Sequence, residues 1–196
     1  MIDAVMLVAL ALARLWAQPM TPGERDFALS SLHSSRRALL DSITGLSEAQ
    51  WKFKPAPGRW SIEEVAEHVI LSEDFVFDRL QKALESPPAA RREVKREPEL
   101  GLLEQLRDRS QRSRNNAQTE PSGRFPTPAA AAEAFRQRRE RTLDFVRTTR
   151  EDLRVHVSGP GQNALDAYQM LILLAGHTDR HVAQINEVKA DPRFPK

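Results

Sequence analysis

Two histidines four residues apart, His177 and His181, are the first feature of this 196-residue sequence that could support chemistry. In a helix, a spacing of four places both imidazoles on one face, one turn apart, where they can share an ion. An apolar stripe through Met170, Leu173 and Ile185 continues across both positions, so we expect the two rings to face the protein interior. Buried imidazoles need polar partners, and a metal ion is one such partner.

A third histidine, His68, lies between Val65 and Leu71 on the predicted inward face of an earlier helix. Three imidazole nitrogens can bind a divalent ion at about 2.0 Å and leave a position for water or substrate, as in catalytic zinc sites. A histidine pair at this spacing also arises by chance, and a lone buried histidine is more often a hydrogen-bonded core residue. The conjunction of pair, stripe and third histidine favours a metal site formed by His68, His177 and His181.

Few other side chains near the three histidines could take part in catalysis. The segment is not a zinc-protease helix, because Thr178 stands where the general-base glutamate should follow the first histidine. Glu64, one turn before His68, is a candidate catalytic carboxylate, but it equally fits a structural role as the acid of a capping box that begins at Ser61. The two histidines without an assigned role, on a predicted polar surface and in a predicted loop, are His33 and His156.

Four segments with the apolar spacing of amphipathic helices must position these side chains. They are residues 25–44, 61–84, 127–149 and 163–189. No segment has a competing strand pattern. Four helices with one long polar connection, at 89–126, predict an all-α, antiparallel four-helix bundle. The connection has a weak helical stretch at 100–111. It either covers the metal site or lies on the surface without a role in the site.

The composition limits the remaining classes of function. The 29 basic residues are balanced by 27 acidic ones and only 6% of residues are aromatic, which disfavours a nucleic-acid binder. The chain has no cysteine, so disulfides, thiolate metal ligands and a cysteine nucleophile are excluded. A transition-metal site must therefore use His, Asp or Glu side chains.

The N-terminal residues are treated separately from the fold. The apolar run at 4–13 is too short to span a bilayer but has the length of a signal-peptide core. Against export, Asp3 precedes the run without any basic residue, and Arg14 interrupts the apolar segment. We interpret residues 1–22 as a signal peptide or an N-terminal extension, and residues 23–196 as the bundle domain. The sequence leaves open whether the protein is exported or cytoplasmic. It also leaves open whether the N-terminal segment is a helix that packs on the bundle.

Two strings resemble proteins of the DinB-like superfamily. Residues 58–68, GRWSIEEVAEH, resemble the start of the second helix of these proteins, and residues 177–185, HTDRHVAQI, resemble part of the fourth. The likeness covers about residues 25–189. It implies an up-down-down-up bundle and frequent homodimers. It also implies a divalent ion, commonly zinc or nickel, held here by His68, His177 and His181.

The resemblance limits the activity only loosely. Characterised relatives include thiol-dependent S-transferases and a maleylpyruvate isomerase that uses a low-molecular-weight thiol. In that chemistry the ion binds a small thiol, and Arg180 or Gln184 positions a small-molecule substrate. An exported protein would not meet the cytosolic thiol pool, which would favour hydrolysis. We expect a metal-dependent transferase or hydrolase; the alternative is a non-enzymatic, metal-stabilised bundle that serves as a stress-linked binding module.

Overall fold

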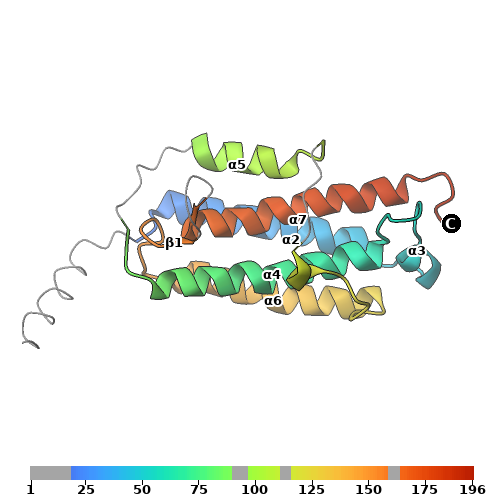
Figure 1. Cartoon of the computed structure of the whole chain (residues 1–196), viewed down its shortest axis with the longest axis horizontal. Coiled ribbons are helices and arrows are strands. Elements are labelled where there is room, and N and C mark those ends of the chain that lie inside the picture. Colours follow the sequence, from blue (N-terminus) through green and yellow to red (C-terminus); the bar gives the residue numbers. More distant parts are fainter. Residues whose placement is uncertain (1–18, 90–96, 111–115, 159–163) are drawn as a thin grey trace, which may run out of the picture.

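The computed structural model describes residues 19–89, 97–110, 116–158 and 164–196. Its four long helices lie side by side in a bundle (Figure 1) and are α2 (Pro22–Ile43), α4 (Ile62–Glu85), α6 (Pro128–Thr148) and α7 (Ala167–Lys189). Helices α2 and α7 run in one direction and α4 and α6 in the other, so the predicted up-down-down-up arrangement is confirmed. Both α2 and α4 pack against α6 and α7.

Smaller elements complete the described chain. They are α3 (Glu48–Lys52), α5 (Glu97–Arg107), the 3-10 helix η1 (Ala117–Thr119), β1 (Val157–Ser158) and β2 (Leu165–Asp166). Helix α5 packs along α7, and η1 packs against α4. Strands β1 and β2 pair in antiparallel fashion, a feature that we did not predict. Each strand has two residues, which is too short for an alternating apolar pattern to appear.

Capping residues set the first residue of each long helix. The Ser61 hydroxyl accepts from the Glu64 amide and the Glu64 carboxylate accepts from the Ser61 amide, so the predicted capping box of α4 is confirmed. Thr127, the first residue of the predicted segment 127–149, caps α6. Helix α2 begins earlier and α7 later than predicted, because capping boxes at Thr21 and Asp166 fix those two starts. Side chains that bond first-turn amides therefore decided these boundaries more than apolar spacing did.

Part of the predicted N-terminal segment can be placed. Residues 1–18 lie outside the described residues, so the signal-peptide interpretation is not addressed. Met20 is 9% exposed and joins the apolar core, and Thr21 caps α2. The last residues of the segment set apart as 1–22 therefore pack with the bundle. None of the described helices is long and apolar enough to cross a membrane.

A buried arginine joins the four long helices. Arg139 of α6 is fully buried and forms a two-point ion pair with Glu73 of α4, with N–O distances of 2.6 and 3.1 Å. The same guanidinium donates to Ser35 Oγ at 2.7 Å and to a backbone carbonyl of α2. It also donates to Thr178 Oγ1 of α7 at 2.9 Å. One side chain thus fixes the relative positions of all four helices.

A second buried arginine lies where α7 begins. Arg154 donates to Glu24 at 2.9 Å, to Glu99 at 2.7 Å and to Asp166 at 3.3 Å. Its guanidinium carbon lies 4.0 Å from the centroid of the Tyr168 ring, within the range of a cation–π contact. Because Glu99 belongs to α5, a buried ion pair fixes the N-terminal part of that helix to the bundle.

We predict that Arg139→Met lowers the free energy of unfolding by about 3–5 kcal/mol, because it leaves the Glu73 carboxylate buried without its partner. Chemical denaturation followed by circular dichroism measures the change. A double variant, Arg139→Met with Glu73→Leu, should recover much of the loss, since no unpaired charge remains.

The matched control is Arg138→Met, at the adjacent position of α6. Arg138 pairs with Asp74 at 2.6 Å, and the side chains are 27% and 35% exposed. Loss of this partly solvated pair should change the free energy of unfolding by no more than about 1 kcal/mol. Equal losses in the Arg138 and Arg139 variants would contradict the special role assigned to the buried network.

Candidate metal centre

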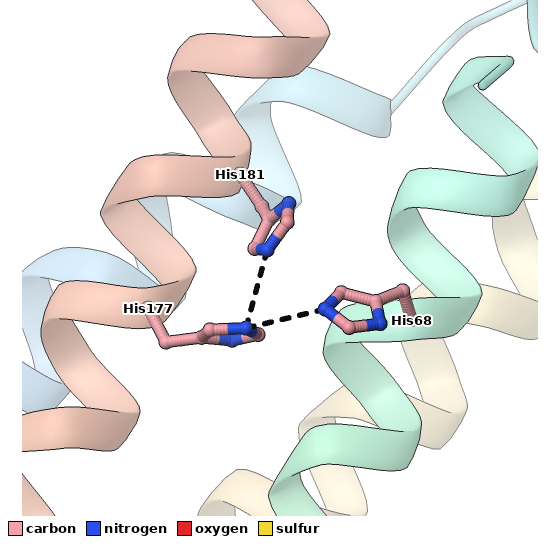
Figure 2. Close-up of side chains that lie close together, drawn as sticks. All are labelled: His68, His177 and His181. Atoms are coloured by element: carbon pink, nitrogen blue, oxygen red, sulfur yellow. Dashed lines mark hydrogen bonds between the residues drawn. The ribbon is translucent and has the colours of Figure 1, made fainter. Parts of the chain in front are cut away.

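Three histidines, His68, His177 and His181, meet between α4 and α7 (Figure 2). The Nε2 atom of His177 lies 3.2 Å from Nε2 of His68 and 3.1 Å from Nε2 of His181. His68 and His181 are 5% and 7% exposed. One nitrogen from each ring lies within 4.8 Å of the others, and the described part of the chain holds no second cluster of this kind.

Each helix carries its histidines among buried apolar residues, which directs the rings into the bundle. On α4, Val65 and Val69 on either side of His68 are 0% and 1% exposed. On α7, Leu174 and Ile185 are 1% and 0% exposed. His68 and His181 are therefore buried, as the apolar stripes predicted, whereas His177 is half-buried.

Hydrogen bonds on the outer side of two rings decide which nitrogen faces the centre. His68 Nδ1 lies 2.9 Å from the carbonyl oxygen of Thr119. A carbonyl only accepts, so Nδ1 carries the proton and Nε2 of the neutral ring keeps its lone pair. His181 Nδ1 lies 2.9 Å from Gln184 Oε1. Arg109 donates to the same amide atom at 3.3 Å, which identifies it as the oxygen and fixes the same tautomer.

The centre therefore holds two lone pairs, on His68 and His181, that both face Nε2 of His177. A neutral His177 has at most one proton at Nε2 and can satisfy only one of them. A cation would accept lone pairs from all three rings. Nitrogens arranged tetrahedrally at about 2.0 Å from zinc are about 3.3 Å apart, close to the spacings here. The donor set and its geometry fit a divalent ion.

Burial favours the neutral form of each ring, which is the form that binds metal. It lowers the pKa of His68 below its ordinary value. It lowers the pKa of His177 to about 3, with smaller contributions from electrostatic repulsion by Arg180 and Arg139 and by His68 whenever that ring is protonated. It also holds the pKa of His181 well below its usual range. All three imidazoles are therefore neutral at pH 7, as metal binding requires.

The two predicted catalytic side chains have structural partners. Besides its role in the capping box, Glu64 accepts from Lys54 Nζ at 2.7 Å. Burial alone would raise the pKa of Glu64, but hydrogen bonds from Lys54 and the Ser61 amide together hold it below its ordinary value. Arg180 donates to backbone carbonyls where α5 ends. Glu64 thus supports the start of α4, and Arg180 supports the end of α5.

The crossover connection packs beside the candidate ligands. Leu103 of α5 is 5% exposed, and the helix lies against α7 at Gly176, the residue before His177. A Cβ atom on Gly176 would lie 2.8 Å from Leu106 Cδ1 and 3.1 Å from Leu103 Cδ2. Of the two alternatives for this connection, the structure therefore favours contact with the site region over an independent surface loop.

Two carboxylates within two residues of the histidines also hold the connection. Asp179 accepts from Arg107 at 2.7 and 3.1 Å. Glu67 is fully buried and accepts from the backbone amides of residues 122–124 at 2.7–3.1 Å. Both carboxylates fix the connection, Asp179 through one oxygen and Glu67 through both of its oxygens.

Thr119 and Arg109 are site residues that sequence reasoning missed. Thr119 acts through its backbone carbonyl, which leaves no signal in the residue type. Arg109 lies in a polar connection, where a single arginine is not distinctive. Gln184 had a usable signal, because a spacing of three on a helix places it beside His181.

Comparisons with known proteins agree with this arrangement. A sequence model of the DinB superfamily matches residues 31–185. The chain belongs to the DinB superfamily. It is 24% identical to the uncharacterized protein YuaE of Bacillus subtilis over an alignment of 162 residues. This alignment covers 82% of this chain and 96% of YuaE.

A solved structure shows the same fold. YfiT from Bacillus subtilis is described as a probable metal-dependent hydrolase with an unusual four-helix bundle topology. It superposes on this DinB-superfamily chain with a TM-score of 0.59 at 14% identity, covering 88% of this chain and 89% of YfiT. At this level of identity the similarity establishes the bundle topology alone.

Gly176→Ala is expected to displace α5, because the added Cβ meets two leucine side chains and overpacking of this kind costs about 1–3 kcal/mol. Backbone amide exchange at residues 97–107, measured by mass spectrometry, should become about tenfold faster or more. The matched control is Gly101→Ala on α5 itself, where a Cβ would meet nothing within 4 Å. It should leave exchange unchanged or slow it, since alanine favours helix by about 1 kcal/mol. Similar exchange in both variants would show that Gly176 does not limit the packing.

Proposed function

We propose that this chain is a metal-dependent enzyme whose divalent ion is held by His68, His177 and His181. The observation that carries the proposal is the convergence of three Nε2 atoms, two of them fixed with their lone pairs inward. Three neutral imidazoles suit zinc or nickel. Such an ion would supply a Lewis acid that polarises a carbonyl or lowers the pKa of water or a thiol.

The proposed reaction class is hydrolysis of, or group transfer to, a small molecule. The description of YfiT as a probable metal-dependent hydrolase supports hydrolysis. The resemblance to thiol-dependent transferases supports transfer. Because the chain has no cysteine, the thiol in a transfer reaction would have to be a separate low-molecular-weight molecule.

The protein groups around the centre would hold the histidine rings in the orientation that metal binding needs. Thr119 and Gln184 hold two imidazoles in the tautomer that a cation needs. The centroid of the Trp60 ring lies 5.0 Å from that of the His68 ring, so the indole packs beside this ligand. Catalytic roles for Glu64 and Arg180 stay predictions, and the contacts of both side chains have structural explanations.

A second candidate function is a metal-stabilised bundle without catalysis. It is favoured by the position of the centre, where α4, α7 and the crossover connection meet. An ion there would join elements far apart in sequence, and its binding free energy would add to the stability of the fold. The two candidates differ in whether a coordination position stays open to ligands from solution.

His181→Ala is expected to abolish metal loading while the bundle still forms, because the other two histidines alone bind a divalent ion much more weakly. Mass-spectrometric metal analysis after dialysis should give one ion per wild-type chain and almost none for the variant. Circular dichroism should show the same helix content in both. His33→Ala is the control, since His33 is exposed on α2, and it should keep one ion. Wild-type affinity in His181→Ala would count against the assignment.

Cobalt substitution distinguishes the enzyme from the structural site. In an enzyme, a small thiol or carboxylate added to the Co²⁺ protein should enter the open position and change its visible absorption spectrum. Turnover should then be found in a panel of thiol-conjugation and of ester and amide hydrolysis assays. An unchanged spectrum together with no turnover would favour the metal-stabilised bundle.

A further inference from the structure

We propose that the crossover connection positions two of the three ligands, with Arg109 and Thr119 as its positioning residues. Binding of the ion and docking of α5 on α7 would then stabilise each other. This inference rests on the proposed metal site and adds the part of the chain that sets its affinity. Arg109 and Thr119 both belong to the described parts of the connection, residues 97–110 and 116–126.

The first contact runs from the connection to His181. Arg109 binds the Glu187 carboxylate of α7 through two nitrogens, at 2.6 and 2.9 Å, which orients its guanidinium. A third nitrogen of Arg109 donates to Gln184 Oε1, the atom that also accepts from His181 Nδ1. Without Arg109, the Gln184 amide could rotate and present its NH₂ group to the ring. That rotation would remove the acceptor that keeps His181 Nε2 free of a proton.

The second contact runs from η1 to His68. The Thr119 carbonyl accepts from His68 Nδ1, and Thr119 is 3% exposed. On one side of it, the Asn116 side chain caps η1. On the other, the buried Glu67 carboxylate accepts from the amides of residues 122–124. The carbonyl is therefore fixed from both directions, and His68 is oriented by a segment that α4 itself holds.

The third ligand, His177, follows a residue on which the connection packs. Leu103 and Leu106 of α5 lie against Gly176, the residue that precedes His177 on α7. The crossover connection thus reaches His68 by a hydrogen bond and His181 through Gln184, and it packs on α7 beside His177. If docking of the connection raises metal affinity by some factor, metal must favour docking by the same factor.

A neighbouring arginine provides a matched control. Arg107 lies in the same segment as Arg109 and pairs with Asp179, also on α7, at 2.7 Å. The Arg107 side chain is 56% exposed. Its two hydrogen bonds both go to Asp179, and neither reaches Gln184 or a histidine. Arg107→Met therefore removes a similar charge and a similar link to α7 without altering the contact with His181.

The experiment measures zinc affinity of the full chain by competition with a chromophoric chelator. Arg109→Met and Gln184→Leu should each weaken zinc binding by about 10- to 100-fold, the range for groups that orient metal ligands. Arg107→Met should stay within about threefold of wild type, as expected for an exposed pair. The Arg109→Met, Gln184→Leu double variant should bind no more weakly than Gln184→Leu alone, because both act through one oxygen.

Hydrogen exchange provides a readout other than affinity. Zinc should slow amide exchange at residues 97–107 in the wild type, and the difference should shrink in Arg109→Met but not in Arg107→Met. Equal zinc affinity in the two arginine variants, or exchange that zinc leaves unchanged, would overturn this inference while the metal site stands. A wild-type chain that binds no zinc would overturn the metal site and this inference together.

Discussion

The buried ion pair between Arg139 and Glu73 lies where the four long helices meet and fixes their relative positions. A guanidinium can donate in several directions at once, and here it contacts α2, α4 and α7 from its own position on α6. An apolar side chain at the same place could fill the volume but could not fix the four helices in one register. One of its partners, Thr178, follows His177 directly. The interaction that aligns the helices therefore also sets the position of a candidate ligand.

The order of helix directions explains why a long connection reaches the site. Helices α4 and α6 run in the same direction, so the chain must return along the bundle, about 36 Å for a helix of 24 residues. A bundle that alternates direction could use short loops at each end. Here the returning segment contacts α7 through α5 and α4 through η1, which brings Arg109 and Thr119 to the outer side of the histidines.

Sequence patterns predicted features that depend on near neighbours. The Ser61 capping box and the inward faces of α4 and α7 were correct because they arise within one or two turns of helix. Features that need distant partners were missed. His156 lies in a loop as assigned, but its burial was not predicted: it is 9% exposed, with Nδ1 3.2 Å from the Ala83 carbonyl oxygen. One local feature was also missed: the start of α7 was placed too early because the capping box of Asp166 and Gln169 was overlooked.

The sequence by itself determined the types of the candidate ligands and the helix faces that carry them, since residue spacing on a helix fixes direction. Only the tertiary structure decided which nitrogen of each ring faces the centre. That choice is made by the Thr119 carbonyl, 51 positions from His68, and by an amide oxygen that Arg109 orients from another segment. A backbone carbonyl, or a side chain from a distant segment, leaves no pattern in the residue spacing around a histidine. Only folding brings these groups to the ring.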